Sequence, residues 1–576
     1  MVPVGYCTKL LSKQTRMVLR ICLYGLAAGL ATVAFQLAIS ALFRHGFKSL
    51  STIGPGWFAM ASLGIILVTS LLVGLILRLC PQAAGSGIPQ LKAAFWADRG
   101  NIPLKVAIVK FTTGVLSIGG GCSLGREGPS VQLAGTVGSN LAAALGRSRR
   151  LGTVAGAAAG LAAAFNTPIA GITFVLEELI GDLGSRYLGG LLLASVLGAL
   201  VTEGLVGNYP AFLMPPIASC SWHAYASAPL VAALAALVGV VFQQMTILTR
   251  GATRRLHRVP GWLMPAIGGL TTWVLGIVVF WRCSRLGVFS LGYDDLTDSL
   301  AGAIGWQTAL LLLVGKLIAT VACYGLGGSG GIFAPSLFLG AMTGSTTAGL
   351  LAHLMVLGPQ DTMALTVVGM SATLGAVVRA PFTSIIIVFE MTREFAIVPL
   401  LMLAGLVSQA ISRSILPHGF YDAILIQDGI DISRLEPPHD LQQWQELPVI
   451  AIANTSPVVA SSLEPDQLAS FIHRHRYNRF PAIVGTQLSG ILARDEAAQA
   501  IKEGRRPRLV PATTCRPNDR IGQVQQSLIS SGAGLAVVLD AAGKIVGIVT
   551  LHDILRAQTD TAKKVQPEDP TEELLS

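Results

Sequence analysis

Charged residues are scarce in this sequence. Only 12% of the 576 residues are Asp, Glu, Lys or Arg, whereas an ordinary soluble protein carries about 25%. The eight cysteines are scattered, and no spacing between them indicates a zinc site or a disulfide framework. The first apolar run is too long for a signal peptide and lacks a clear cleavage site, so we expect no cleaved leader. Much of the net charge of +10 lies in short loops, a pattern that relates to membrane topology and argues against nucleic-acid binding.

Apolar residues and glycine are abundant instead. Hydrophobic residues make up 52% of the chain and there are 64 glycines, a composition typical of closely packed membrane helices. Lys9, Lys13, Arg16 and Arg20 precede the first apolar run, which places the N-terminus in the cytosol. The sequence therefore predicts a helical, multi-pass membrane protein with additional soluble mass. The apolar runs in its first part are 21–43, 57–77, 103–118, 130–145, 151–165, 168–180 and 187–206, and those in its second part are 227–249, 261–281, 308–324, 336–355, 363–378, 381–391 and 396–415.

The stretch Gly119–Ser130, with the sequence GGGCSLGREGPS, lies between the apolar runs 103–118 and 130–145. Its glycines allow a bend, and Pro129 suits the first turn of a helix. A helix start attracts anions, and Glu127 adds an anion of its own. A glycine-rich turn can also be only a packing device. A phosphate-binding loop is excluded because Arg126-Glu127 stands where Lys-Ser/Thr would be required. The stretch thus predicts an intramembrane anion site with a carboxylate that competes for it.

The stretch occurs twice, which indicates an internal duplication. A shift of 206 residues superposes nine identical residues, and Phe333 then takes the place of Glu127. Broken segments at corresponding places in two halves are the best sequence pointer to the binding site of a transporter. The residues alone do not tell whether the halves are parallel or inverted. The nine pairs are Lys110/Lys316, Val115/Val321, Gly119/Gly325, Gly121/Gly327, Ser123/Ser329, Gly125/Gly331, Pro129/Pro335, Ser130/Ser336 and Leu133/Leu339.

Two adjacent carboxylates end the run 168–180. Neighbouring residues do not share a helix face, so Glu177 and Glu178 should have different roles. Glu177 has a counterpart, Glu390, which favours a structural role such as a helix cap or an ion pair. Glu178 corresponds to Met391 and has no counterpart. We therefore regard Glu178 as the stronger functional candidate.

Two further positions each allow two interpretations. Ser86, in the break Gly85–Pro89, is either an ordinary helix cap or a hydroxyl donor to an anion. Tyr421 follows Pro417 and Gly419 and, by position alone, is typical of an aromatic anchor at the membrane interface.

The sequence resembles the CLC chloride channel and transporter family. The motifs that carry the resemblance are Gly85–Pro89 (GSGIP), Gly125–Pro129 (GREGP), Gly331–Pro335 (GIFAP) and Tyr421, in the order of the family and over roughly residues 15–425. The resemblance implies an all-α membrane fold with an inverted internal repeat, and a homodimer in which each subunit has its own pore. It also implies that Glu127 is the gate and Glu178 the inner proton-transfer residue. The chloride-binding residues that it implies are Ser86, Tyr421, Ile332, Phe333, Arg126 and Gly128.

After residue 425 the composition changes. A polar linker, 426–447, precedes alternating strand and helix patterns in 448–558, and residues 559–576 form a polar tail. The turn 541–544 predicts a hairpin. Two strand–helix–strand–strand–helix units, 448–503 and 509–558, resemble a cytosolic pair of CBS domains, a small α/β fold. By this resemblance, Thr550 and Asp553 would hold an adenine nucleotide, whereas the first unit lacks the threonine in Gly490–Asp495.

The sequence therefore predicts a chloride/proton antiporter. The expected organisation is a cytosolic segment 1–20, a membrane domain 21–425 with halves of about 21–206 and 227–425, and the CBS pair. A passive chloride channel on the same fold and a nucleotide-sensing signalling protein remain as alternatives. An enzyme is not expected, because no His lies in the motif segments to serve a hydrolase. We expect chloride, protons and the lipid bilayer as partners, no metal, no cofactor other than the adenine nucleotide, and location in a bacterial inner membrane with both termini cytosolic.

Overall fold

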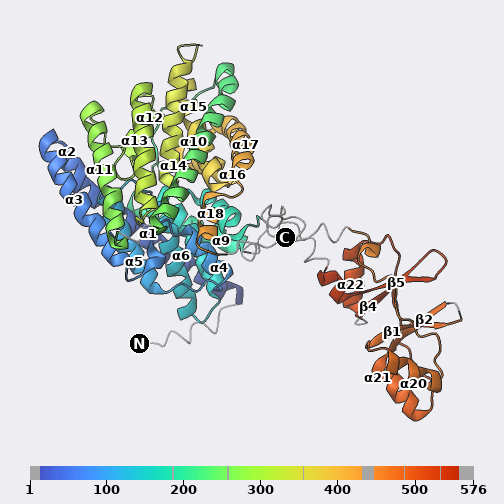
Figure 1. Cartoon of the computed structure of the whole chain (residues 1–576). Coiled ribbons are helices and arrows are strands. Elements are labelled where there is room, and N and C mark those ends of the chain that lie inside the picture. Colours follow the sequence, from blue (N-terminus) through green and yellow to red (C-terminus); the bar gives the residue numbers. More distant parts are fainter. Residues whose placement is uncertain are drawn as a thin grey trace. The chain divides into compact units, whose positions relative to one another are not determined.

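The structure is a computed structural model that describes residues 13–183, 187–255, 259–354, 356–430, 447–485, 487–531 and 534–556. The chain forms two compact units, Met1–Pro437 and Pro438–Ser576 (Figure 1). Residues 1–12 of the predicted N-terminal segment, 431–446 of the linker and the tail 559–576 lie outside the described residues.

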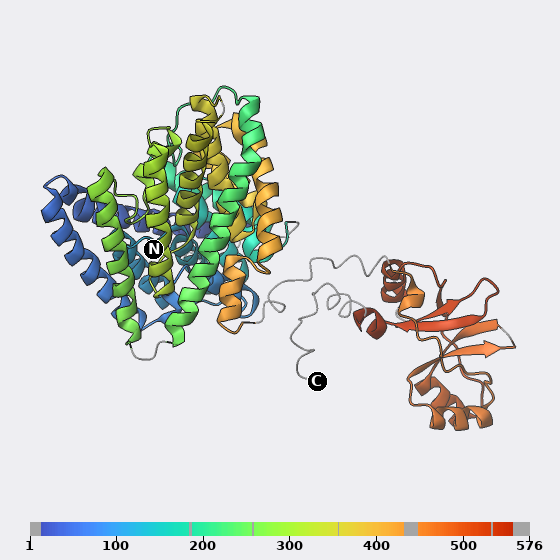
Figure 2. The ribbon, with the colours of Figure 1, turned by 45° about the horizontal axis from the view of Figure 1, so that its top comes forward.

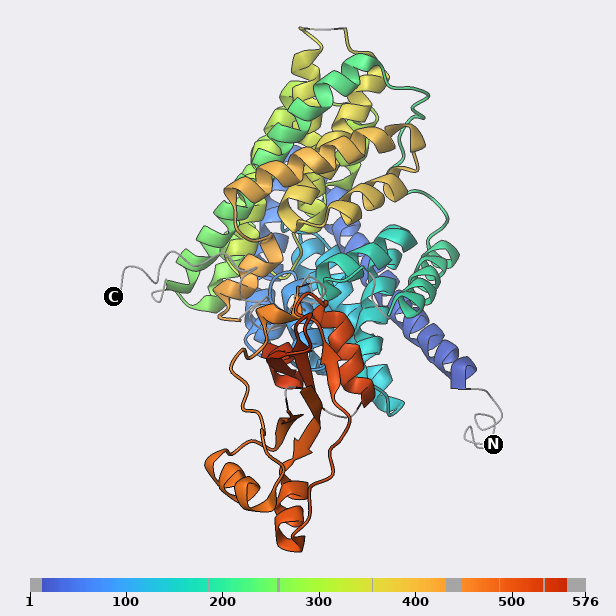
Figure 3. The same cartoon turned by 90° about the vertical axis from the view of Figure 1, so that its right-hand side faces the viewer.

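The first unit is entirely helical over its described residues. Among the described residues, eight helices are long and apolar enough to cross a membrane, as predicted for a multi-pass protein. Figures 2 and 3 show these helices side by side in one bundle. The elements before residue 206 are α1 (Lys13–Phe43), η2 (Arg44–Lys48), α2 (Ser49–Ser51), α3 (Pro55–Leu77), η3 (Pro81–Ala83), α4 (Ile88–Trp96), α5 (Leu104–Gly114), η4 (Val115–Gly119), α6 (Glu127–Ala144), α7 (Arg149–Phe165), α8 (Pro168–Phe174), η5 (Val175–Ile180) and α9 (Leu188–Leu205).

The second half of this unit follows the same plan. Its α13 and α14 correspond to α5 and α6, and its α16 corresponds to α8. The elements are α10 (Trp222–Arg255), η6 (Gly261–Leu263), α11 (Met264–Cys283), α12 (Tyr293–Leu300), α13 (Trp306–Gly325), α14 (Phe333–Leu351), α15 (Pro359–Val378), α16 (Pro381–Thr392), η7 (Phe395–Ile397), α17 (Val398–Ile415) and α18 (Phe420–Gln427).

Small residues let the central helices of both halves approach closely. A Cβ added to Gly138 of α6 would lie 2.1 Å from the Gly152 carbonyl oxygen of α7. A Cβ on Gly340 of α14 would lie 2.3 Å from the Gly369 carbonyl oxygen of α15. Contacts of this kind bring helix backbones together where lipid supplies no hydrophobic drive for association. The two tight helix pairs hold the breaks at the starts of α6 and α14 in the centre of the unit.

The second unit is a small α/β structure. Strands β1 (Arg479–Val484) and β2 (Gln487–Ala493) pair antiparallel, while β4 (Leu535–Leu539) lies between the parallel β3 (Thr513–Cys515) and the antiparallel β5 (Ile545–Thr550). The predicted hairpin turn joins β4 to β5, where the Asp540 N–H donates to the Lys544 carbonyl at 2.9 Å. The remaining elements are η9 (Val449–Ala451), α20 (Pro465–Arg474), α21 (Arg494–Glu503) and α22 (Ile521–Ser531), followed by a helical turn at 551–556.

Candidate functional site

The two repeated breaks meet inside the first unit. Gly125 donates its N–H to the Gly331 carbonyl at 2.7 Å, and Gly331 donates in return to the Gly125 carbonyl at 2.6 Å. Such mutual bonds satisfy backbone groups where no water is present to do so. They bring the start of α6 against the start of α14.

The Gly85 break joins this pair. The Gly85 N–H donates to the Gly328 carbonyl, and the Gly85 carbonyl accepts from the Gly330 N–H, both at 3.1 Å. The fully buried Lys110 adds a third bond, from Nζ to the Gly85 carbonyl at 2.8 Å. Three breaks distant in sequence therefore form one polar centre within the helical bundle.

Glu127 lies at this centre and is fully buried. Its Oε2 accepts the Ala334 N–H at 3.2 Å, in the first turn of α14. Its Oε1 accepts the Tyr293 hydroxyl at 2.5 Å and lies 3.9 Å from Arg126 Nε. The N–H groups of a first helical turn have no acceptor inside the helix and favour anions. The carboxylate therefore occupies a position suited to an anion.

Arg126 and Gly128 flank this carboxylate. Arg126 donates from Nη2 to the Ala164 carbonyl at 3.0 Å, and its guanidinium lies 5.3 Å from the centre of the Tyr293 ring. Gly128 lies directly against Ser86, since a Cβ on Gly128 would be 2.2 Å from Ser86 Oγ. A side chain at residue 128 would thus separate the start of α6 from Ser86.

The Ser86 and Tyr421 hydroxyls lie near each other and are both buried. Apart from each other, neither has a hydrogen-bond partner within the described part of the chain. A buried hydroxyl without a partner costs about 1–3 kcal/mol. The cap residue of α4 is Gly87, so Ser86 is not that cap. The Tyr421 ring is 1% exposed and is therefore not an interfacial anchor. The structure excludes both ordinary interpretations and leaves two donors directed into the protein.

Ile332 and Phe333 form the cap and first residue of α14, beside Ala334. Their N–H groups belong to the set that a helix start leaves without internal acceptors. Phe333 is buried and packs against Phe165 and Phe174, with ring centroids 6.0 and 6.1 Å away. This aromatic packing fixes the helix start that faces Glu127.

Glu178 lies in the π-helical segment η5 and is buried. Lys92 of α4 reaches its Oε1 at 3.4 Å and also binds Asp422 Oδ1 of α18 at 2.8 Å. Sequence reasoning missed Lys92 and Asp422. The signal was present, because Lys92 is the one charged residue of the short helix after Ser86 and Asp422 follows Tyr421 directly. The cation ties Glu178 to the two helices that carry the buried hydroxyls.

Tyr293 was also missed, and no sequence signal identified it. It belongs to the short α12, in a connection that carries none of the repeated motifs. Its partner Glu127 is 166 residues away in the chain.

Two cavities open at opposite ends of α11. The Tyr293 pocket, of about 360 Å³, is lined by Arg126 and Tyr293 and by Ser284, which follows the end of α11. The Gly85 pocket, of about 780 Å³, is lined by Gly85, Gln90 and by Met264 at the start of α11. A helix of 20 residues is about 30 Å long, close to the hydrocarbon thickness of a bilayer. The polar centre therefore has one cavity toward each end of a membrane-length helix.

The corresponding breaks of the two repeats face different cavities. Arg126, in the first break, lines the Tyr293 pocket, whereas Leu326 and Gly327, in the second break, line the Gly85 pocket. Equivalent segments directed to opposite ends of α11 are the arrangement of an inverted repeat, as the resemblance implied.

The family model described as voltage gated chloride channel matches residues 68–413. The chain belongs to this family. It is 29% identical to the H(+)/Cl(-) exchange transporter ClcA of Klebsiella pneumoniae, over 70% of this chain and 86% of that protein. It is 31% identical to a ClcB-like chloride channel protein of Ralstonia nicotianae, over 72% of this chain and 98% of that protein. These relatives carry ions, in agreement with the prediction that the chain is not an enzyme.

Solved structures of the same family share the fold. A slow cyanobacterial Cl-/H+ antiporter superposes with a TM-score of 0.64 at 23% identity, covering 72% of this chain and 98% of that one. A eukaryotic CLC transporter superposes with a TM-score of 0.60 at 20% identity, covering 94% of this chain and 98% of that one. The predicted fold class, a CLC membrane domain with a small α/β domain, is confirmed.

The second unit contains a CBS domain, whose family model matches residues 508–560. A cavity of about 380 Å³ lies between the two strand–helix units and is lined by Tyr477 and Arg479 from one and by Thr550 and Asp553 from the other. Thr550 donates its N–H and its hydroxyl to Asp553 Oδ2 at 2.9 and 2.6 Å, and accepts the Asp553 N–H at 3.3 Å. These bonds cap the helical turn at 551–556, so both predicted nucleotide residues already have a structural role.

Proposed function

We propose that this member of the voltage gated chloride channel family exchanges chloride for protons. The observation that carries the proposal is the position of the Glu127 carboxylate at the start of α14, bound to the Ala334 N–H. Ionised Glu127 excludes chloride from that helix start, and protonated Glu127 releases it, so proton binding and chloride entry share one place. The name of the Klebsiella pneumoniae relative, an H(+)/Cl(-) exchange transporter, supports the same reaction.

Chloride is held by neutral donors in this proposal. Among the described residues, the Ser86 and Tyr421 hydroxyls have no hydrogen-bond partner apart from each other, which supports a shared ligand. The Ile332 and Phe333 N–H groups serve from α14, and the backbone N–H groups of Arg126 and Gly128 act from the start of α6. Partial positive charge binds a halide weakly enough to let it leave.

Glu178 passes protons between the Glu127 region and the Gly85 side. Its position in a π-helical segment supports a functional role, since such segments are frequent at functional sites. Holding a carboxylate in the membrane is costly, so its presence there requires a role or a partner. Lys92 is such a partner at 3.4 Å, and this observation favours the second candidate function, a passive chloride channel in which Glu178 is structural.

The organisation of the protein completes the proposal. The membrane domain, residues 21–425 with halves of about 21–206 and 227–425, forms a homodimer in a bacterial inner membrane. Its N-terminus and the CBS pair, 448–503 and 509–558, lie in the cytosol. The Gly85 pocket then faces the cytosol and the Tyr293 pocket faces outward. An adenine nucleotide binds between the CBS units at Thr550 and Asp553.

Simultaneous chloride and pH recording on liposomes under a chloride gradient tests this function. The wild type is expected to move protons against chloride, Glu178→Gln to move chloride without protons, and Glu127→Gln to pass chloride without a gate. Glu177→Gln is the matched control, because it removes the adjacent carboxylate, which lies on another helix face. Wild-type chloride movement without any proton countertransport would replace the antiporter with the channel.

A further inference from the structure

The Tyr293 hydroxyl binds the carboxylate of Glu127, the proposed gate. Its hydroxyl donates to Glu127 Oε1 at 2.5 Å, while the Ala334 N–H donates to Oε2 at 3.2 Å. Each carboxylate oxygen thus has its own donor, one from α12 and one from α14. We propose that Tyr293 is a latch that keeps Glu127 in the anion position and so limits chloride throughput. The proposal rests on the proposed gating role of Glu127.

The Tyr293 side chain is fixed by its surroundings. Its ring packs edge-on against Phe212, with centroids 5.1 Å apart and an interplanar angle of 85°. The Arg126 guanidinium covers the ring at 5.3 Å from its centre. Aromatic and cation–π contacts of this geometry are favourable beyond area burial. These contacts restrict the Tyr293 side chain to one rotamer, in which its hydroxyl points at Glu127.

The loop before Tyr293 is anchored as well. The fully buried Lys316 donates from Nζ to the Ser290 carbonyl at 2.6 Å and to the Gly287 carbonyl at 3.0 Å. The Ser290 N–H in turn donates to the Gly121 carbonyl at 3.1 Å, in the first repeated break. Asp295 accepts the Gly287 N–H at 2.6 Å and pairs with Arg285 at 3.0 Å. The start of α12 is thus tied to the loop that carries Glu127.

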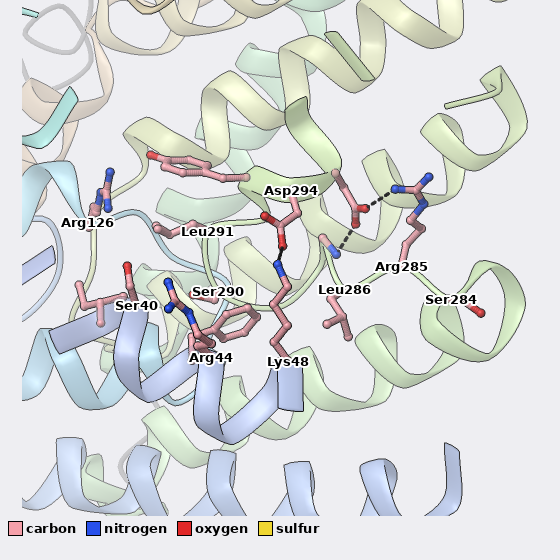
Figure 4. Close-up of a pocket in the computed structure, with 16 residues that line it drawn as sticks. Ser40, Arg44, Lys48, Arg126, Ser284, Arg285, Leu286, Ser290, Leu291 and Asp294 are labelled. Carbon is pink, nitrogen blue, oxygen red and sulfur yellow. Dashed lines mark hydrogen bonds and ion pairs between the residues drawn. The ribbon is translucent and has the colours of Figure 1, made fainter. Parts of the chain in front are cut away.

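The latch lies on the route of an incoming anion. Arg44 and Lys48 of η2 line the Tyr293 pocket together with Arg126 and Arg285 (Figure 4). Two carboxylates line it too, Asp294 paired with Lys48 at 2.7 Å and Asp295 paired with Arg285. Four cationic side chains and two carboxylates give the lining a net positive charge, and a positively charged cleft concentrates anions. An anion drawn into the pocket reaches the Tyr293–Glu127 pair before it reaches α14.

The latch acts more strongly on the ionised gate. Hydrogen bonds to a charged group are roughly twice as strong as those between neutral groups. The other groups that act on Glu127 are Arg126 and, from the α18 side, Tyr421, while α14 contributes the backbone N–H of Ala334. Loss of the Tyr293 hydroxyl should therefore favour opening mainly at alkaline pH, where Glu127 is charged.

The test compares Tyr293→Phe with wild type in chloride efflux from liposomes between pH 4.5 and 8. Phenylalanine keeps the ring contacts and removes only the donor. We expect efflux at the alkaline end to rise about tenfold, the equivalent of about 1.4 kcal/mol, with little change at the acidic end. Tyr24→Phe is the control, because Tyr24 is buried among Ile21, Ala28 and Ala155 in a separate cluster. Its efflux should match the wild type at every pH.

A Glu127→Ala background separates the latch from a general effect of the substitution. With no carboxylate to hold, Tyr293→Phe should add nothing to the efflux of Glu127→Ala. Equal acceleration in both backgrounds would show that the hydroxyl only obstructs the pocket, and would overturn the proposal. If Tyr293→Phe has wild-type efflux while Glu127→Ala has fast efflux, the latch proposal is wrong and the gating role of Glu127 stands. Wild-type efflux and coupling in Glu127→Ala would remove the gate itself and the latch with it.

Discussion

Glu177 and Glu390 exchange helix caps across the two repeats. Glu177 accepts the Phe382 and Thr383 N–H groups at the start of α16, at 3.3 and 2.9 Å. Glu390 accepts the Ile169 and Ala170 N–H groups at the start of α8, at 3.0 and 2.7 Å. Each carboxylate satisfies two orphan donors of the opposite repeat. The duplication predicted a shared structural role for this pair, and the structure confirms a cap.

The exchanged caps predict that substitutions of the adjacent Glu177 and Glu178 affect different properties of the protein. Glu177→Gln should lower the stability of the protein by about 1 kcal/mol, the usual cost of a weakened cap, and leave proton coupling intact. Glu178→Gln should stop proton movement. Thermal unfolding in detergent, alongside the coupled flux assay, measures both effects. Loss of coupling in Glu177→Gln with normal stability would contradict the division of roles.

Ser86 should determine anion preference. Ser86→Pro removes a hydroxyl donor and reshapes the loop, and Ser86→Ala removes the donor alone. We expect chloride preference over nitrate to fall about five- to tenfold in Ser86→Pro, as for the loss of one hydrogen bond of about 1 kcal/mol. Ser139→Ala is a matched control, since that buried hydroxyl bonds the Gly100 carbonyl at 2.6 Å. An unchanged preference in flux assays would remove Ser86 from the ligands.

Lys92 should stabilise the protein through the two carboxylates it joins. Lys92→Met removes the cation from the buried Glu178 and from the partly exposed Asp422, and breaking a buried pair costs about 3–5 kcal/mol. The variant should therefore melt well below the wild type in detergent. Adding Glu178→Gln and Asp422→Asn should restore part of the loss. A triple variant that melts no higher than Lys92→Met would argue against this network.

Asp553 should affect both the nucleotide and the fold of the second unit. Because it caps the turn at 551–556, Asp553→Ala is expected to loosen that turn as well as to weaken adenine nucleotide binding. Calorimetry of the full chain with AMP, ADP and ATP measures the affinity. Asp495→Ala, at the corresponding place in the first copy, is the control and should leave the affinity unchanged. Equal affinity in wild type and Asp553→Ala would leave only the capping role.

Cys515 should make the second unit sensitive to alkali. Burial raises the pKa of this thiol from 9.0 to about 11, so the unfolded chain loses the proton before the folded chain does. Stability of the β3–β4–β5 sheet is therefore complete below about pH 9 and falls as the pH rises toward 11. Hydrogen exchange of peptides covering β3 and β4 reports this change. Cys515→Ala should make the stability of this sheet less dependent on pH. If the variant loses as much stability as the wild type at alkaline pH, another group is responsible.

Much of the fold and part of the site can be derived from the residues alone. The apolar runs, the duplication and the glycine–proline breaks are local patterns, so Glu127, Ser86 and the α14 start could be selected without coordinates. The alternation after residue 448 likewise marked the α/β unit. Local spacing could not distinguish a capping serine from a buried donor, because both precede a helix in the same way.

The contacts around the carboxylates were decided only by the tertiary structure. Tyr293 meets Glu127 across 166 residues, and Lys92 meets Glu178 across 86. Neither residue belongs to a periodic or repeated pattern, so composition and spacing carry no sign of the pairing. The direction of the repeats was open for the same reason, because a duplicated sequence folds with either orientation. The sequence by itself determined which backbone segments break inside the membrane, since glycine and proline act locally, whereas packing of distant helices determined which side chains meet there.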